Sequence, residues 1–203
     1  QKDLTDNGAE VSLDPDLQDG SRKSLTDLDY AALIDLGWQI DGGSSYVPNI
    51  LLAGDSANTL TIQDDGIVGN GLSEYVLNGD PPVTFATADS DLLLVGGGND
   101  DSISILSIDS LFTGEIFVNA ASGDDLLTID HSIAESISYN GQLGNDSLAL
   151  LGDPVNSVTH RFTNSSDGSI LVADGSDTSS VFYAGLEPIF DSVFAVNRFF
   201  EFG

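Results

Sequence analysis

The chain has 203 residues, with 33 acidic residues against five lysines and arginines, which gives a formal net charge of −28. Such a surface repels phosphate backbones and anionic lipid headgroups, so the composition argues against nucleic-acid and membrane-surface partners. There is no cysteine, which excludes disulfides and thiolate metal sites, and no apolar run of about 18 residues predicts a transmembrane helix.

Divalent cations are the natural counterions of so acidic a chain. Carboxylate and carbonyl oxygens are hard ligands, and among divalent ions they favour calcium. The other interpretation is a solubilising acidic surface, of the kind found in halophilic or secreted proteins. Composition alone leaves both interpretations open. The abundance of Gly, Ser, Asp and Asn favours an extracellular or cell-surface β-rich protein over a cytosolic enzyme.

The segment 1–24 is polar and acidic and is interpreted as an irregular arm. A helix is predicted over residues 25–38. Thr26 is placed as its N-cap and Asp29 three positions later completes an arrangement similar to a capping box. Leu28, Ala32 and Leu36 recur at helical spacing, and Gly37 provides a stop signal.

Residues 25–38 resemble the last helix of the catalytic domain in secreted, matrixin-like zinc metallopeptidases of bacteria. In that family the helix follows the zinc site. The His-Glu-x-x-His motif is absent here, and the two histidines, His131 and His160, are too few for a three-histidine zinc site. The resemblance therefore implies either an accessory region of such a peptidase, without its catalytic part, or a peptidase-like helix in a chain with no peptidase.

Short strands separated by Gly, Asn, Asp and Pro follow the linker at residues 41–45. They are predicted at 47–52, 59–63, 75–77, 83–87, 92–95, 102–106, 115–119, 126–130, 136–140, 147–151, 159–163, 169–173, 180–183 and 190–196. No helical periodicity appears after residue 40. The sequence thus predicts an acidic arm with one short helix over residues 1–40 and an all-β repeat domain over residues 41–203.

An internal repeat favours a parallel β-helix, or β-solenoid, of a few coils. The positions of Asp101, Asp125 and Asp146 differ by 24 (125 − 101) and by 21 (146 − 125), and a short strand precedes each of these aspartates. A unit of that length is about one coil of a parallel β-helix. A β-sandwich is the alternative, because strand spacing alone would equally suit it.

The segment from Gly141 to Ala149 matches the nonapeptide Gly-Gly-x-Gly-x-Asp-x-U-x at every fixed position except Gln142, and Leu148 fills the apolar position U. In this respect the chain resembles the haemolysin-type (RTX-like) calcium-binding repeats of large bacterial secreted and surface proteins. The copies at residues 95–103 and 120–128 are degenerate, since Ala120 and Ala121 replace both leading glycines in the second.

The resemblance, together with the charge of the turns, predicts calcium. The predicted ligands are Asp100, Asp101, Asp124, Asp125 and Asp146, assisted by Asn99 and Asn145. Stacked carboxylates would repel one another unless a cation neutralised them. The alternative is that Asn99, Asp124 and Asn145 cap tight turns through hydrogen bonds to the backbone.

No motif places a nucleophile beside Asp130-His131, so this pair is interpreted as a surface feature and no enzymatic activity is predicted. The C-terminal residues are strongly aromatic and predict a last strand. Such a strand either closes the repeat or, as an exposed apolar edge, pairs with another copy. The sequence therefore predicts a non-catalytic extracellular structural protein, a calcium-associated β-solenoid that self-associates in a surface layer, matrix or filament. The alternative is the accessory C-terminal region of a secreted metallopeptidase.

Overall fold

The chain divides into two compact units, residues 1–44 and 45–203. The computed structural model describes residues 5–6, 9–10, 49–52, 56–87, 91–133, 135–175 and 177–203. In the first unit, β1 (Thr5–Asp6) pairs antiparallel with β2 (Ala9–Glu10). The helix predicted over residues 25–38 lies outside the described residues.

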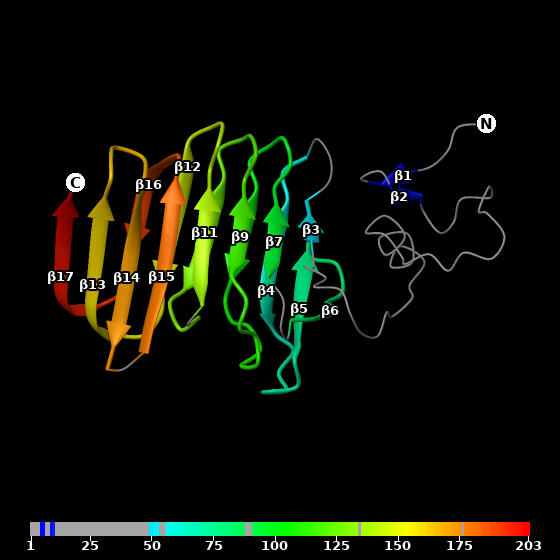
Figure 1. Cartoon of the computed structure of the whole chain (residues 1–203), viewed down its shortest axis with the longest axis horizontal. Coiled ribbons are helices and arrows are strands. Elements are labelled where there is room, and N and C mark those ends of the chain that lie inside the picture. Colours follow the sequence, from blue (N-terminus) through cyan, green and yellow to red (C-terminus); the bar gives the residue numbers. More distant parts are fainter. Residues whose placement is uncertain are drawn as a thin grey trace. The chain divides into compact units, whose positions relative to one another are not determined.

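The described part of the second unit consists of strands in two mixed sheets (Figure 1), which confirms the predicted all-β fold. The seven-stranded sheet has the order β16-β12-β10-β8-β4-β5-β6 and the eight-stranded sheet the order β17-β13-β14-β15-β11-β9-β7-β3. The strands are β3 (Asn49–Leu51), β4 (Thr59–Asp64), β5 (Leu72–Leu77), β6 (Val83–Ala86), β7 (Leu92–Val95), β8 (Ser102–Ile105), β9 (Ile116–Asn119), β10 (Leu126–Asp130), β11 (Ser136–Asn140), β12 (Asp146–Leu151), β13 (Val155–Phe162), β14 (Gly168–Asp174), β15 (Asp177–Ala184), β16 (Leu186–Asp191) and β17 (Ala195–Phe202). No described helix is long and apolar enough to cross a membrane.

From β7 to β12 successive strands alternate between the two sheets and pair in parallel. Leu126 of β10 lies beside Ser102 of β8 on one side and Ser147 of β12 on the other. The paired positions differ by 24 residues (126 − 102) and by 21 residues (147 − 126), the same differences that separate Asp101, Asp125 and Asp146. In the other sheet, Ile116 of β9 lies beside Leu92 of β7 and Ile137 of β11, again at those two steps.

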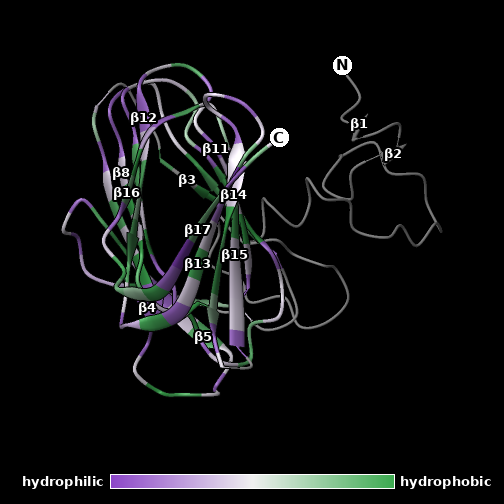
Figure 2. Cartoon of the chain, turned by 90° about the vertical axis from the view of Figure 1, so that its left-hand side faces the viewer, coloured by the Kyte–Doolittle hydropathy of each residue, from purple (hydrophilic) through white to green (hydrophobic). Residues whose placement is uncertain are grey.

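The core lies between the sheets and follows from the alternation of apolar and small polar residues. Side chains on successive positions of a strand point to opposite faces, so every second residue enters the core. In Ser102-Ile103-Ser104-Ile105 the isoleucines are buried and the serines are only partly buried. Because the strands are in register, buried residues align in rows such as Ile103, Leu127 and Leu148. Figure 2 shows the two layers from the C-terminal end.

Antiparallel strands complete both ends of the parallel region. β5 and β6 extend the seven-stranded sheet, and β13 and β14 extend the eight-stranded one. The single strand predicted over residues 190–196 is wrong: β16 ends at Asp191 and β17 begins at Ala195. The carboxylate of Asp191 accepts the Val193 N–H (3.0 Å) and Val193 is buried, so the chain turns here and passes from one sheet to the other.

Glycine is required where successive turns stack on one another. Gly144 and Gly123 have positive φ angles of 143° and 134°. A Cβ atom on Gly144 would overlap the carbonyl of Gly123, and one on Gly123 would overlap the backbone of Asn99. The glycines of the nonapeptide pattern therefore allow backbone to pack directly on backbone between neighbouring repeats.

We expect Gly144→Ala to lower the free energy of unfolding by about 3 kcal/mol or more, because overpacking adds to the backbone strain. Gly79→Ala is the matched control: its φ is 78° and its Cβ would meet nothing within 4 Å. Strain alone should cost about 1 kcal/mol there. Urea unfolding of both variants checks the difference, and equal losses would show that turn stacking contributes nothing.

Candidate functional site at the aspartate turns

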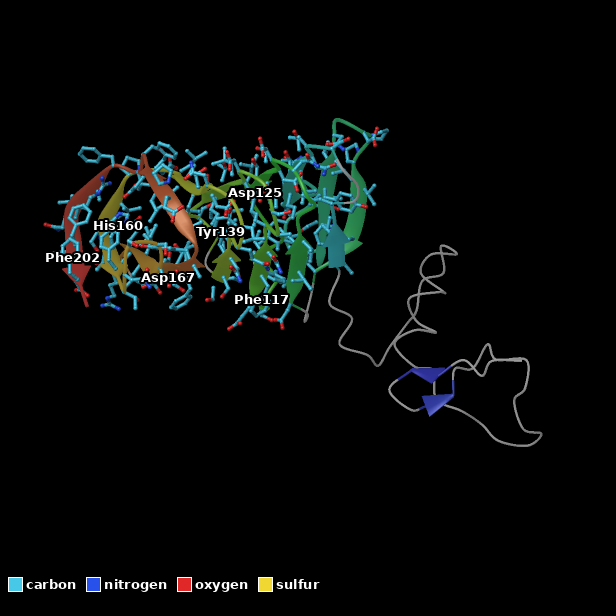
Figure 3. The ribbon with its side chains drawn as sticks, turned by 90° about the horizontal axis from the view of Figure 1, so that it is seen from above. Phe117, Asp125, Tyr139, His160, Asp167 and Phe202 are labelled. Carbon is cyan, nitrogen blue, oxygen red and sulfur yellow. The ribbon has the colours of Figure 1, made fainter. Side chains whose placement is uncertain are left out.

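Three turns, here named the aspartate turns, carry the predicted site residues: residues 96–101, 120–125 and 141–146. Each one connects a strand of the eight-stranded sheet to a strand of the seven-stranded sheet, namely β7 to β8, β9 to β10 and β11 to β12. They lie side by side along one edge of the unit, at the top of Figure 1. Figure 3 looks down on this edge, with Asp125 in the middle of the stack.

The last aspartate of each turn is buried and bonds to the repeat before it. Asp101, Asp125 and Asp146 are 2%, 2% and 0% exposed. Asp146 Oδ1 accepts the Asp125 N–H (3.0 Å), and Asp125 Oδ1 accepts the Asp101 N–H (2.6 Å). Asp101 Oδ1 in turn accepts the Asn58 N–H (2.8 Å). The three carboxylates therefore form a buried row that runs along the stack.

The residue before each buried aspartate bonds in the opposite direction. Asp100 Oδ1 accepts the Asp124 N–H (2.9 Å), and Asp124 Oδ1 accepts the Asn145 N–H (3.0 Å). These three residues are exposed. Neighbouring turns are thus joined by an inner and an outer bond that run in opposite directions. The side chain of Asp124 thus bonds to the backbone of the next repeat and not to its own turn, and capping of the turns by Asn99 and Asn145 stays a prediction.

Two oxygens of the buried row have no hydrogen-bond partner among the described residues, Asp125 Oδ2 and Asp146 Oδ2. The buried hydroxyl of Tyr139 on β11 also has none. Burial raises the pKa of Tyr139, and the charges of Asp146 and Asp125 raise it further. Asp101 differs, because its Oδ2 accepts the Gly97 N–H (2.7 Å). Within the buried row, the unpartnered carboxylate oxygens are therefore those of the last two repeats.

Burial raises the pKa of Asp125 from 3.8 to about 6, against the opposing effect of the Asp101 N–H, and the charges of Asp146, Asp101 and Asp100 add to the rise. Burial is likewise the main cause of a raised pKa at Asp146, where the hydrogen bond from the Asp125 N–H opposes it. Two adjacent buried carboxylates are costly unless one is neutralised. A proton on one carboxyl group, or a cation bound between the two, would neutralise the pair.

The described residues contain no group of three His, Cys, Asp or Glu side chains arranged to hold a metal ion. The predicted ligands form two rows and do not converge on one point. A calcium ion at the last two repeats would use Asp125 and Asp146 and would take its remaining oxygens from a hydroxyl, a backbone carbonyl or water. The side chains of Asp100, Asp101 and Asp124 already accept backbone N–H bonds. Calcium binding by the seven predicted residues stays a prediction.

Sequence reasoning missed Tyr139, although a signal was present. On the side of the preceding repeats its row is occupied by the aliphatic residues Val118 and Leu94, and on the other side it meets a second buried tyrosine, Tyr183 of β15. A tyrosine in such a row brings a hydroxyl into the core, which requires a polar neighbour. The reasoning also missed Asp109, which is buried and accepts N–H bonds from residues 69, 70, 71 and 111.

His131 and His160 take part in hydrogen bonds. The Nε2 atom of His131 lies 2.8 Å from the carbonyl oxygen of Asp153, and the ring is partly buried. His160 is buried, with its Nε2 atom 2.9 Å from Asp191 Oδ2. Both histidines thus join segments that are far apart in the chain.

Comparison with protein-family models, with curated proteins and with solved structures finds no match to this chain. The resemblance to RTX-like repeats and that to matrixin-like peptidases both stay predictions.

The second position of the nonapeptide keeps the backbone conformation of glycine even where glycine is absent. Gln142 and Ala121 have φ angles of 67° and 74°. Residues with a Cβ atom adopt this left-handed conformation at a cost of roughly 1 kcal/mol.

We expect Ala121→Gly to raise the free energy of unfolding by up to about 1 kcal/mol, because it relieves that strain. Ala173→Gly, in the strand β14, is the control, and should lower stability by roughly 0.5–1 kcal/mol through added backbone entropy. Denaturant midpoints of the two variants should therefore move in opposite directions. A loss of stability in both would contradict the argument.

Asp125→Asn should change how stability depends on pH. Relative to a group with an ordinary pKa, the raised pKa in the folded state contributes stability that is fully present below pH 3.8 and is lost as the pH rises through about 6. Asparagine keeps the Oδ1 acceptor and removes the charge. In the presence of a chelator, the free energy of unfolding of the variant should rise relative to that of the wild type between pH 4 and pH 7, by at most about 3 kcal/mol. Urea unfolding at each pH measures the gain.

Asp124→Asn is the matched control for the pH experiment, since it removes one negative charge from the same turn at an exposed position. If the free energies of unfolding of the wild type and Asp125→Asn differ by the same amount across this pH range, the pKa of Asp125 is not raised in the folded state.

Proposed function

We propose that the protein is a non-catalytic extracellular structural module, a short calcium-associated β-solenoid that self-associates through a free strand edge. The observation that carries the proposal is β17, an edge strand of the eight-stranded sheet whose side chains are mostly exposed.

The parallel pairing supports the solenoid. In a β-sandwich, neighbouring strands are mainly antiparallel and connected by hairpins or Greek keys. Here β8, β10 and β12 pair in parallel, as do β7, β9 and β11, and the chain passes from one set to the other at every step. One such circuit corresponds to one coil of a solenoid, and it advances the chain by one aspartate repeat.

The C-terminal strand supports self-association. Phe199, Phe200 and Phe202 are 52%, 56% and 80% exposed, and the apolar side chains of Phe182, Phe190, Phe194 and Val196 are also exposed. An exposed apolar edge strand is a template for pairing with another chain, and clustered exposed apolar residues mark interaction sites. This aromatic end lies at the left of Figure 3, where Phe202 is labelled.

The distribution of charge supports contact at the same end. A chain with a net charge of −28 repels its own copies. Among the described residues the lysines and arginines are Arg161 and Arg198, on β13 and β17. Arg161 pairs with Glu201 (2.7 Å) and Arg198 with Asp191 (3.2 Å), so charges near β17 are balanced. Repulsion between copies is therefore weakest there.

The buried row supports association with calcium. Asp125 and Asp146 bring two unpartnered carboxylate oxygens together at one edge, and a divalent cation offsets the cost of burying them as charges. A cation bound only to the folded chain raises its stability by mass action.

The first test is a thermal melt with and without millimolar calcium, beside light scattering on the same sample. Calcium should raise the melting temperature of the wild type. At a hundredfold excess over Kd, binding adds about 2.7 kcal/mol to the free energy of unfolding. It should leave the double variant Asp125→Asn, Asp146→Asn unchanged. Asp80→Asn, at an exposed turn, is the control and should respond as the wild type does.

Scattering should report particles larger than the monomer in the wild type and monomers in a variant with Phe200→Ser and Phe202→Ser. An unchanged melting temperature on adding calcium would remove calcium from the proposal, and a monomer at all concentrations would remove self-association.

A further inference from the structure

Two aromatic pairs cross from β13 to β17 and end at the edge of the sheet. The ring of His160 stacks on Phe200 and the ring of Phe162 stacks on Phe202, each with centroids 5.3 Å apart. These residues are opposite one another in the parallel register of the two strands. The outer partner in each pair, Phe200 or Phe202, therefore has one ring face without a neighbouring strand.

The inner face of β17 is also open. The seven-stranded sheet ends at β16, and a cleft of about 390 Å³ lies between β16 and the inner-facing residues of β13 and β17. Asp191, at the end of β16, bonds to His160 and Arg198 inside this cleft, which fixes the edge strand against the rest of the unit. β17 is thus tied to the rest of the unit by charged groups while its phenylalanines stay exposed.

The two edges of the eight-stranded sheet are unequal. β17 has eight residues, whereas β3 at the opposite edge has three. In a head-to-tail contact, β17 of one copy would meet β3 of the next, and most of β17 would stay unpaired. The edges of the seven-stranded sheet, β16 and β6, have six and four residues, so the described edge that matches β17 in length is the same strand of another copy. A contact between identical strands is two-fold symmetric and antiparallel.

Side-chain charges select the register of such a contact. An antiparallel pair centred on Phe199, near the middle of β17, would use almost the whole strand. It would place Arg198 opposite Phe200 of the second copy, a favourable cation–π arrangement. A pair centred on Arg198 or on Glu201 would place like charges directly opposite each other, which is destabilising. A pair centred on Phe200 avoids this clash but lies further from the middle of the strand, so it pairs less of β17.

We propose that two copies join end to end through β17, antiparallel about a two-fold axis at Phe199, so that the eight-stranded sheets of both copies become continuous. This inference rests on the proposed self-association and specifies its geometry. A two-fold contact is closed: it joins two chains and leaves none of its own surface for a third. Any longer assembly needs a second contact elsewhere on the molecule.

Cysteine cross-linking tests the axis, because the natural chain has no cysteine. Phe199→Cys places one thiol on the axis in each copy. Directly opposite residues of antiparallel strands have Cα atoms about 4.5–5.5 Å apart, within the range of a disulfide. Oxidised glutathione should convert the two thiols to one disulfide, being itself reduced to two glutathione thiols. We expect most of the protein to run as a covalent dimer. Val68→Cys, 81% exposed on the β4–β5 loop, is the control and should form no covalent dimer.

A charge reversal tests the contact without cysteine. Phe199→Arg places two arginines against each other on the axis, and should weaken the dimer at least tenfold by sedimentation equilibrium at about 0.15 M salt. Phe182→Arg is the matched control, since Phe182 is also a half-exposed phenylalanine on another strand of the same sheet, β15. Circular dichroism confirms that each variant is folded.

The outcomes separate the inference from the function on which it rests. A wild-type dimer that Phe199→Cys locks and Phe199→Arg dissociates supports the two-fold contact. Polymers that grow with concentration, or a dimer that neither variant affects, overturn it but keep self-association. A wild-type monomer at all concentrations overturns both.

Discussion

A hydrogen bond between an aspartate carboxylate and the backbone of the neighbouring repeat is the interaction on which this fold depends. The buried row, Asp101, Asp125 and Asp146, and the exposed row beside it join each turn to the next from two sides. Together with backbone bonds such as that from the Gly123 N–H to the Leu143 carbonyl (2.9 Å), these bonds hold the turns close together, which explains why Gly123 and Gly144 have no room for a side chain. The same spacing sets the register of the strands that leave each turn, so the apolar rows of the core follow from it.

The arrangement has an electrostatic cost that grows along the stack. Asp101 has both oxygens bonded, whereas Asp125 and Asp146 each keep an unpartnered oxygen in the core, near the hydroxyl of Tyr139. A site where burial raises the pKa of a carboxyl group responds to protons and to cations alike, because both neutralise it. The proposed role of calcium and the predicted pH dependence are therefore two consequences of one buried pair. The aromatic end differs in character, since its charges are balanced and its apolar side chains are exposed.

Sequence reasoning located most of this structure because the responsible signals are local. Short apolar or alternating segments bounded by Gly, Asp and Asn predicted the observed bounds of β7, β10 and β11, and the spacing of three aspartates predicted the steps of the parallel register. What it missed depends on contacts between distant segments. The division of residues 190–196 into two strands requires Asp191 to bond with Val193 and His160, and Asp109 is buried only because the loop at residues 69–71 closes over it. Tyr139 needed a comparison between repeats, which alternation within a single strand does not provide.

The stacking of the aspartate turns also bears on how such a chain changes in evolution. Through Asp124 and Asp125, the middle turn donates one N–H group and offers one carboxylate to each neighbour, so in these bonds its two faces are alike. Duplication or deletion of a gene segment encoding one repeat would therefore insert or remove a unit whose bonds are already complementary to those around it. The repeat that ends at Asp125 is longer than the one that ends at Asp146, and loops on the far side of the stack absorb the difference. Chains of this design would be expected to vary in the number of repeats, while the strands at the edges of the sheets, which have one neighbour among the described residues, stay specialised.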